Sequence, residues 1–593
     1  MGKRLKELTR NNTKCMVKVN GVTLIERALH QLDALSLNRI VVVVGYEGQK
    51  LQEYIGTLTV NTPIEFIDNP IYDKTNNIYS LWLAREELAK DDTLLLESDL
   101  IFEDSVLRAL VDDPRDTLAL VDKYERWMDG TVVKLDEEDN ILAFVPGKQF
   151  DFSEVSQYYK TVNLYKFSKQ FSVSHYIPFL DAYSKALGNN EYYEQVLRVI
   201  AMLDDPGIRG KRLNGQKWYE IDDVQDLDIA SSMFTPDPDE RLRALESRYG
   251  GFWRYPKMVD FCYLVNPYYP PKKMREELKA SFDVLLTQYP SGMRVNSLLA
   301  GKNFGLHPEH IVVGNGASEL IKSLLESMKG KLGITRPTFE EYPHRVDHVQ
   351  LVEFHAPGPD YRYDEQDLIR FFSAHPVEDL ALINPDNPSG NYIPKAGVLR
   401  LADWCEANGV RLIVDESFVD FADEADATML DEQILAAHPH MVVVKSISKS
   451  YGVPGLRLGV LACANEELIR YIKKDVSIWN INSFAEYYMQ IEEKYKKDYT
   501  AALARFRAVR ADFAEKLATL PGVRVLPSQA NYFMCELTGG MTAHHLCLAM
   551  LDRNILIKDV SPKVHDEGQF VRIAVRTTEE NNNLIDAMRA VLV

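Results

Sequence analysis

The sequence predicts an α/β protein with a Rossmann-like first domain and a second α/β unit that ends in a smaller α+β subdomain. In the first third, short apolar runs such as RIVVVVGY (39–46) and DTLLLESDLIF (92–102) alternate with amphipathic segments. The alternation resumes after residue 250 in HIVVGNGASELI, EDLALINPDNPSG and GVRLIVDESFVDF. Strands alternating with helices are typical of a doubly wound parallel sheet.

We expect two domains joined by a linker, because 593 residues are too many for one hydrophobic core. The first domain takes residues 1–232. The polar, proline-containing stretch TPDPDERLRALE then indicates a linker over residues 233–254. The second domain takes residues 255–593, and its smaller subdomain begins near residue 490 with a long predicted helix.

Charge and cysteine usage exclude several classes of partner. The net charge of −19 disfavours broad contact with nucleic acid or an anionic membrane, since such a surface needs a clustered basic excess. No apolar stretch approaches the roughly 18 residues of a membrane-spanning helix, and no secretory signal is recognisable. The six cysteines lack the paired spacing of a zinc or redox site. We expect a cytoplasmic protein that acts on small molecules.

The most specific segment is KSISKSYGVPGLRLG, residues 445–459. A lysine flanked by small hydroxyl residues, with an arginine further along a glycine-containing loop, has the groups that hold pyridoxal phosphate (PLP). We expect Lys449 to bind the cofactor covalently and Ser446, Ser448 and Arg457 to hold its phosphate. A solvated basic loop is the alternative for this segment taken alone.

Three other strand ends support this cofactor site. VDESF places Asp415 where a carboxylate can pair with the pyridinium nitrogen, and NPDNPSG places Asn387 in a turn suited to the ring hydroxyl group. GNGASELI offers Gly316, Ala317 and Ser318 at a helix start, where free backbone N–H groups favour a phosphate. Four such segments in this order indicate one PLP site.

Together these segments resemble the class I/II aminotransferases, in particular the branch of histidinol-phosphate aminotransferase and threonine-phosphate decarboxylase, over roughly residues 255–593. The resemblance implies a PLP fold-type I domain and a homodimer. It also implies that Tyr289 in QYPSG reaches the cofactor phosphate of the neighbouring subunit, and that Phe339 in RPTFEEY stacks on the ring. A core position is the alternative for Phe339.

Two positions depart from the family pattern. Phe418 stands where the family usually has a tyrosine, which removes one hydrogen bond to the ring oxygen. In VRIAVRT, Arg572 matches the arginine that binds a substrate anion, and Arg576 replaces a small residue. Two arginines on one strand face would suit a dianion, whereas a surface salt bridge is the alternative for Arg576.

Acidic residues follow two apolar strands of the first domain. LLLESDLIF places Glu97 and Asp99 at a carboxyl end, where open α/β sheets bind ligands, and WYEIDDVQDL places Asp222 and Asp223 after another strand. One carboxylate from each strand suits Mg²⁺, which takes oxygen ligands and bridges phosphates. The alternative for these acids is helix capping.

Two basic residues near the start of the chain complete the requirements of a nucleotidyl transfer. We expect Lys14 and Arg4 to neutralise a triphosphate. Such a transfer needs charge neutralisation, alignment and a good leaving group. Lys14 and Asp99 are therefore the candidate catalytic groups.

The segments TKCMVKVNG, NNIYSLWLA, ESD, VDKYERWMDGTVV and WYEIDDVQDL, in this order, resemble the sugar-nucleotidyltransferase superfamily and most closely its phosphocholine cytidylyltransferase-like members, over about residues 1–232. The resemblance implies CTP as donor, Mg²⁺ at Asp99 and Asp222 or Asp223, and an acceptor with an amine and a phosphate or phosphonate. Residues expected to line the pocket are Asn76, Asn77, Tyr79 and Lys123, with Lys160 and Asn163 as weaker candidates.

In that superfamily a buried strand and a glycine-rich turn precede the segment that here opens the sequence. Removing a central strand from a parallel sheet leaves backbone groups unpaired and a slot in the core, which destabilises the fold strongly. Because the remaining motifs show no decay, we expect the natural protein to be longer at its start. An inactive domain is the alternative.

The whole arrangement resembles bifunctional cytidylyltransferase–transaminase enzymes of phosphonate biosynthesis. This resemblance implies transamination of phosphonoacetaldehyde by an amino-acid donor, followed by CMP transfer from CTP to 2-aminoethylphosphonate with release of pyrophosphate. One alternative joins a phosphocholine- or phosphoethanolamine-type cytidylyltransferase to an amino-acid-phosphate decarboxylase or a histidinol-phosphate-like aminotransferase. A second alternative is a transaminase regulated by a non-catalytic nucleotide-sensing domain.

Overall fold

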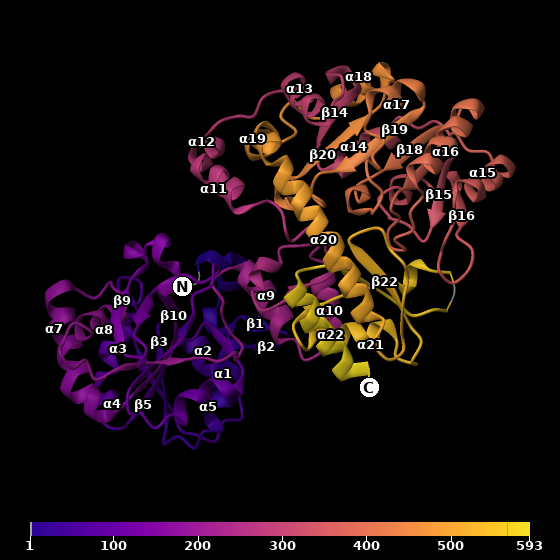
Figure 1. The fold of residues 1–593 in the computed structure, drawn as a ribbon. Coiled ribbons are helices and arrows are strands. Elements are labelled where there is room, and N and C mark those ends of the chain that lie inside the picture. The colour runs from indigo at the N-terminus through magenta and orange to yellow at the C-terminus, as the bar shows by residue number, and fades with distance from the viewer. Residues whose placement is uncertain (1–2, 566, 593) are drawn as a thin grey trace. The chain divides into compact units, whose positions relative to one another are not determined.

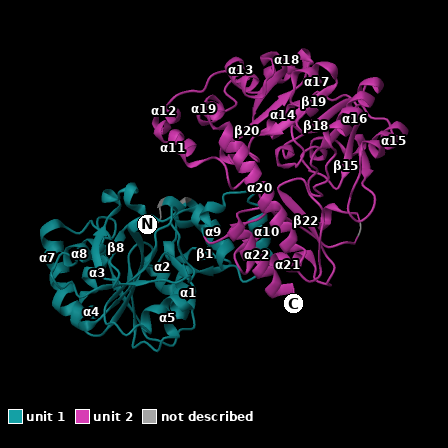
Figure 2. Cartoon of the chain, in the orientation of Figure 1, with its two compact units in different colours: residues 1–256 teal, residues 257–593 magenta. Residues whose placement is uncertain are grey.

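The computed structural model describes residues 3–565 and 567–592. The chain forms two compact units, Met1–Pro256 and Lys257–Val593 (Figure 2). The first unit includes the segment that we expected to be a linker. That segment folds as helix α10 (Pro238–Glu246), which buries Leu242 and Leu245.

The main sheet of the first unit is mixed rather than parallel. Its order is β11-β7-β10-β8-β9, with β5 also paired to β10. The long strand β10 runs antiparallel to β5, β7 and β8, and only β11 pairs in parallel, with β7. The strands are β5 (Thr93–Leu96), β7 (Leu118–Lys123), β8 (Val132–Leu135), β9 (Ile141–Val145), β10 (Tyr158–Phe167) and β11 (Arg209–Arg212).

Three smaller pairs of strands complete the first unit. They are β1 (Lys18–Val19) with β2 (Val22–Thr23), β3 (Ile40–Val44) with β4 (Ile64–Asp68), and β6 (Leu100–Phe102) with β12 (Trp218–Glu220). The helices before α10 are α1 (Leu24–Asp33), α2 (Gly48–Ile55), α3 (Asn77–Leu83), α4 (Arg85–Leu88), α5 (Asp104–Val111), α6 (Lys169–Phe171), α7 (Ile177–Leu187), α8 (Glu194–Ile200) and α9 (Val224–Phe234).

Strands β3 and β5 border one large cavity. Within the described residues β3 pairs only with β4, and β5 pairs only with β10, so each strand has one edge without a strand partner. Residues 40–43 and 93–96 line a cavity of about 1400 Å³ together with α1 side chains such as Leu29. The cavity extends to the acids that follow β5.

The second unit contains a seven-stranded sheet in the order β14-β20-β19-β18-β17-β15-β16. Its strands are parallel except for β20, which runs antiparallel to β14 and β19. Successive residues of β18 face opposite layers: Leu412 and Val414 pack in one core with α16, and Ile413 packs in another with α14. The strands are β14 (Ile311–Asn315), β15 (Leu332–Arg336), β16 (Leu351–His355), β17 (Asp379–Ile383), β18 (Arg411–Asp415), β19 (Met441–Ser446) and β20 (Leu458–Ala462).

A second, four-stranded antiparallel sheet forms the smaller subdomain, in the order β21-β22-β25-β24. The long helix α20 (Lys496–Leu517) precedes it in the chain and runs from the large sheet toward β22 (Figure 1). The strands are β21 (Val523–Val525), β22 (Tyr532–Leu537), β24 (Lys558–Asp559) and β25 (Phe570–Ala574), and a separate pair joins β13 (Val259–Asp260) to β23 (Ile555–Leu556).

Helices cover both faces of the large sheet, as expected for a doubly wound α/β unit. The other helices of the second unit are α11 (Lys272–Ala280), α12 (Phe282–Thr287), α13 (Met293–Phe304), α14 (Ala317–Glu326), α15 (Glu365–Ala374), α16 (Lys395–Asn408), α17 (Glu432–Ala437), α18 (Glu466–Asp475), α19 (Ser483–Ile491), α21 (Ala543–Leu551) and α22 (Thr578–Leu592). Among the described residues, no helix has the length and apolar character needed to cross a bilayer.

Candidate active sites

The predicted PLP residues follow three neighbouring strands of the large sheet. Asp415 ends β18, Asn387 lies in the turn after β17, and Lys449 lies in the turn after β19. Because β17, β18 and β19 run parallel, their carboxyl ends meet at one edge, which is where open α/β sheets bind ligands.

Gly316 and Arg457 form a cradle at the start of α14. Gly316 has a φ of 75°, and its N–H donates to the Arg457 carbonyl oxygen over 2.7 Å. A Cβ on Gly316 would lie 2.5 Å from Nη2 of Arg457, and one on Gly459 would lie 2.4 Å from the Ala317 nitrogen. Only glycine permits these approaches, which set a guanidinium against the first free N–H groups of a helix, as an anion site requires.

Ser448 supports the assignment of this cradle to a phosphate. Its side chain is buried, and its hydroxyl group has no hydrogen-bond partner among the described residues. A buried hydroxyl left unpaired is unfavourable, and a phosphate oxygen would satisfy it. Ser446 is also buried, and its N–H donates to Ser417 Oγ over 3.0 Å. The cradle and the Ser448 hydroxyl together fit the phosphate of PLP.

Two residues that sequence analysis missed hold Asp415. Ser417 donates to Oδ1 from its N–H over 3.0 Å and from its hydroxyl over 2.6 Å, and the Tyr342 hydroxyl donates to Oδ2 over 3.0 Å. Burial raises the pKa of Asp415, while these hydrogen bonds and the nearby Lys449 oppose the rise. The carboxylate is thereby oriented to pair with a protonated ring nitrogen.

Lys449 has the properties of a nucleophilic amine. Burial, with the nearby Arg572 and Arg457, lowers its pKa to about 8, and Asp415 opposes this shift. An amine whose pKa lies close to neutrality is more often uncharged and able to attack a carbonyl carbon. This suits covalent binding of the cofactor aldehyde.

The two C-terminal arginines differ in position, although the sequence predicts that they share a strand face. Arg572 lies on β25 and donates to Asn387 Oδ1 over 2.7 Å and to the Cys262 carbonyl over 2.8 Å, so it reaches the cofactor residues. Strand β25 ends at Ala574, and Arg576 instead pairs with Glu580 over 2.7 Å. The salt-bridge alternative therefore describes Arg576, and the expectation that both arginines share a strand face is wrong. Binding of one anion by both residues stays a prediction.

Three aromatic positions of the second unit lie in different settings. Phe418 is buried and packs edge-on against Tyr532, with ring centroids 5.2 Å apart. Phe339 is half-buried beside the core that includes α14. Tyr289 is 79% exposed and stacks on Trp479, with centroids 4.6 Å apart. Within one chain Tyr289 therefore faces solvent, and its role across a dimer stays a prediction.

In the first unit, Lys14 bridges two of the predicted acids. Its Nζ lies 2.5 Å from Asp99 Oδ2, in the turn between β5 and β6, and 2.6 Å from Asp222 Oδ1, after β12. Burial alone would lower the pKa of Lys14, but the two carboxylates outweigh it and raise the pKa above its usual value. Arg4 donates to Asp222 Oδ2 over 2.9 Å. Three segments distant in sequence thus form one charged site.

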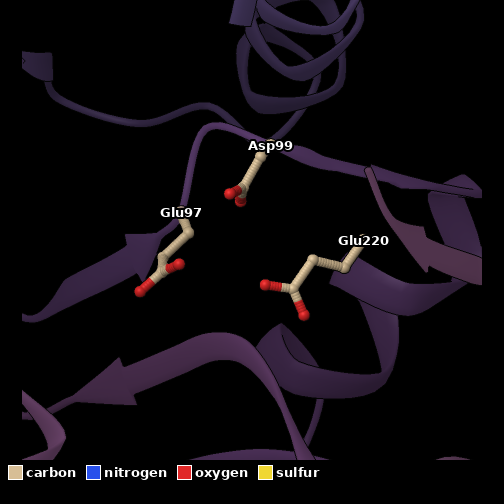
Figure 3. A group of neighbouring side chains, drawn as sticks. All are labelled: Glu97, Asp99 and Glu220. Carbon is tan, nitrogen blue, oxygen red and sulfur yellow. The ribbon is translucent and has the colours of Figure 1, made fainter. Parts of the chain in front are cut away.

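Glu97, Asp99 and Glu220 converge on one point, and each offers an oxygen within 4.8 Å of the others (Figure 3). Oδ1 of Asp99 is buried without a hydrogen-bond partner among the described residues. Burial raises the pKa of Glu220 to about 7, and the nearby Asp99 and Asp222 add to this rise while Lys160 and Lys14 oppose it. Carboxylate oxygens in this arrangement fit a divalent metal ion. Glu220 was not predicted from the sequence.

Asp223 is a helix cap, which is the alternative that the sequence left open for these acids. Its carboxylate accepts from the N–H groups of Gln225 and Asp226, over 2.8 and 3.0 Å, at the start of α9. The Asp226 carboxylate in turn accepts from the Asp223 N–H over 3.1 Å, which completes a capping box. Asp222 alone of this pair faces Lys14.

The predicted pocket residues divide into two groups. Asn76 and Asn77 line the cavity, and Nδ2 of Asn77 donates to Glu97 over 3.1 Å. Tyr79 and Lys123 do not line it: Tyr79 stacks on Trp82, and Lys123 donates to the Ser156 carbonyl. The prediction that these two line the pocket is therefore not borne out by the geometry.

The two weaker candidates, Lys160 and Asn163, both lie at the cavity. Lys160 is 1% exposed, donates to the Thr161 carbonyl over 2.8 Å and lies 3.4 Å from Glu220. Asn163 donates to Glu97 over 3.4 Å. Both residues line the cavity with Glu97 and Glu220.

Comparison with known proteins identifies both units. Residues 281–588 match the family described as aminotransferase class I and II, and residues 1–170 match the MobA-like NTP transferase domain. Over its whole length the chain is similar to the CMP-5'-(3-aminopropyl)phosphonate synthase of Streptomyces rubellomurinus, with 33% identity over 100% of this chain and 94% of that protein.

The second unit has further relatives. It is 33% identical to the L-serine phosphate decarboxylase of Sulfurospirillum multivorans over 56% of this chain and 88% of that protein. The solved structure of a decarboxylase from the same organism is 31% identical, covers 57% of this chain and 90% of its own, and has a TM-score of 0.53. The histidinol-phosphate aminotransferase of Clostridium acetobutylicum shares the fold, with 23% identity over 56% of this chain and 99% of its own and a TM-score of 0.51. The chain therefore belongs to the class I and II aminotransferase family, preceded by a MobA-like NTP transferase domain, and is an enzyme with both types of unit.

Proposed function

We propose that this enzyme forms the CMP ester of a short ω-aminoalkylphosphonate and that its second unit makes the amine. The observation that carries the proposal is the full-length similarity to a protein named CMP-5'-(3-aminopropyl)phosphonate synthase. The acceptor that the sequence favours is 2-aminoethylphosphonate, and 3-aminopropylphosphonate is its next homologue. The nucleotide donor is CTP, and the metal is Mg²⁺.

In the first unit, the acids and Lys14 would serve the transfer of CMP. A divalent ion held by Asp99 together with Asp222, or with Glu97 and Glu220, would neutralise the triphosphate and the departing pyrophosphate. Lys14, which pairs with Asp99 and Asp222, would then contact the triphosphate. A phosphonate oxygen attacks the α-phosphorus of CTP and forms a new P–O bond. The bond between the α-phosphorus and the oxygen that joins it to the β-phosphate breaks, and pyrophosphate leaves.

In the second unit, this chain's residues would bind the substrate and move one proton. PLP, when bound, supplies an electron sink for bond breaking at the carbon that bears nitrogen. Lys449 transfers the proton at the substrate carbon, and Asp415 keeps the ring nitrogen charged. Arg572, next to Asn387, binds the phosphonate as a charge-assisted, bidentate donor.

Two reactions would deliver the amine. One is transamination of phosphonoacetaldehyde by an amino-acid donor. The other is loss of CO₂ from an α-amino acid that carries a phosphonate, and the 33% identity to an L-serine phosphate decarboxylase favours it. CO₂ release from 2-amino-3-phosphonopropionate or 2-amino-4-phosphonobutyrate, without a keto acid, would support decarboxylation. Keto-acid formation that depends on phosphonoacetaldehyde would support transamination.

The proposal includes a homodimer formed by the second unit. The exposed aromatic pair of Tyr289 and Trp479 supports it, since exposed large aromatic side chains are common at interfaces. Sedimentation of the protein should give the mass of a dimer, and Tyr289→Asp should weaken both association and cofactor retention. A monomer that keeps full activity would contradict this part of the proposal.

A further inference from the structure

Two buried polar atoms at the cavity of the first unit lack partners. Glu194 is 6% exposed and Tyr193 is 3% exposed, and both line the cavity. Oε2 of Glu194 and the hydroxyl of Tyr193 have no hydrogen-bond partner among the described residues. Buried polar groups are almost always satisfied, and leaving one unpaired is unfavourable. A pair of such atoms at a cavity wall therefore points to a ligand.

The charges that line the cavity favour a cation as this ligand. Ten acids and six lysines or arginines line it, and Glu97, Asp99, Glu194 and Glu220 are four of these acids. Lys14 pairs with Asp99, and Lys160 pairs with Glu220. Glu97 and Glu194 form no ion pair within the described part of the chain. Burial raises the pKa of Glu194, and burial together with the neighbouring acids raises that of Glu97.

Asn77 connects the unpartnered atoms to the predicted metal site. Its Nδ2 donates to Glu97 Oε1 over 3.1 Å, and its Oδ1 accepts from the Tyr193 N–H over 3.0 Å. Tyr193 and Glu194 are therefore held beside Glu97, whose carboxylate also converges with those of Asp99 and Glu220. A ligand with one end at Glu194 could therefore place its other end at the metal.

We propose that Glu194 and Tyr193 bind the ammonium group of the acceptor, which is a primary alkylammonium. This inference rests on the proposed function of the first unit. A primary ammonium has three N–H donors, and the Glu194 carboxylate and the Tyr193 hydroxyl offer oxygen acceptors. With the ammonium bound there, the phosphonate end faces the metal and CTP, so the length of the alkyl chain sets which acceptor fits.

The test compares an amine with its amine-free analogue. CMP transfer to 3-aminopropylphosphonate and to propylphosphonate is measured as pyrophosphate release for the wild type, Glu194→Gln, Tyr193→Phe and Glu86→Gln. Glu86 is an exposed acid on α4 that does not line the cavity, so its variant controls for loss of charge. We expect Glu194→Gln to lower kcat/KM for the amine by roughly 30-fold or more, because it breaks a buried charge pair.

The same variant should leave kcat/KM for propylphosphonate within about twofold, since that acceptor has no group to pair with Glu194. Tyr193→Phe should lower the amine's kcat/KM less than Glu194→Gln does, and Glu86→Gln should change neither acceptor. Glu194→Gln should unfold at or above the wild-type temperature, because it removes an unpaired buried charge. Equal losses for the two acceptors, or no loss for either, would overturn the inference.

A wild type that releases no pyrophosphate with either acceptor would contradict the proposed function and not this inference. Calorimetry then decides: binding of 3-aminopropylphosphonate that Glu194→Gln abolishes would support the ammonium site. Absent binding, or binding equal in the two proteins, would overturn it.

Discussion

The Nζ of Lys14 lies 2.5 Å from Oδ2 of Asp99, so an amine from the first segment of the chain and a carboxylate after β5 form one half-buried ion pair. We expect Asp99→Asn to lower pyrophosphate release from CTP by roughly 100-fold or more, because it removes a carboxylate that we propose as a metal ligand. The reaction of the second unit should stay within about twofold of wild type when its own substrate is supplied. Equal loss of both activities would indicate a folding defect instead.

Asp222 and Asp223 are adjacent in sequence and should differ in effect. Asp223→Ala removes the cap of α9 and should cost about 1 kcal/mol of unfolding free energy, with little change in the kcat of CMP transfer. Asp222→Ala should abolish transfer while changing the unfolding temperature less. Thermal unfolding and steady-state kinetics on both variants check this, and the reverse pattern would refute the assignment.

Arg572 and Arg576 provide a matched pair in the second unit. Arg572→Ala should lower kcat/KM for the phosphonate substrate by roughly 100-fold or more, since it removes the guanidinium beside Asn387 that we propose to bind the phosphonate. Arg576→Ala breaks an ion pair with Glu580 at the surface and should alter kcat/KM by less than about threefold. If the two variants are equally impaired, both arginines bind the substrate.

The pKa of Lys449 predicts a pH dependence for cofactor capture. Because only the uncharged amine attacks the PLP aldehyde, the capture rate of the cofactor-free protein should rise with pH and level off above about 8. Arg572→Met removes a neighbouring positive charge, so its midpoint should shift to higher pH. Absorbance of the bound cofactor over time provides the measurement. A midpoint near the usual lysine value of 10.5 would contradict the lowered pKa.

Strand β3 pairs only with β4 among the described residues, and a large cavity lies along it. About half of the β3 amides, those pointing away from β4, should therefore exchange rapidly with deuterium. Full protection of these amides would contradict this prediction.

Sequence and structure agree best where a motif lies at the end of a parallel strand. Lys449, Asp415 and Asn387 could be predicted because neighbouring parallel strands bring their ends together, whatever the intervening loops. Glu220 could not, since it lies at the site through an antiparallel pairing with Leu100 across a long separation in sequence. The alternation of VRIAVRT gives no sign that β25 ends at Ala574, so Arg576 was assigned to the wrong surroundings.

Neighbouring acids present a further limit to prediction. Asp222 and Asp223 have the same side chain, and only the backbone at the start of α9 decides which one caps the helix and which one faces Lys14. Glu194 and Tyr193 belong to none of the motifs in the sequence. They become candidates only because the fold buries them at a cavity without partners.

The most direct test of the proposed function is pyrophosphate release from CTP and Mg²⁺ with four acceptors: 2-aminoethylphosphonate, 3-aminopropylphosphonate, phosphoethanolamine and phosphocholine. We predict that an aminoalkylphosphonate has a kcat/KM at least about tenfold above either phosphate ester, since one substituent contact commonly discriminates to that extent. A preference for phosphocholine or phosphoethanolamine would contradict the proposed function. CTP binding without pyrophosphate release for any acceptor would contradict it as well and favour a nucleotide-sensing domain.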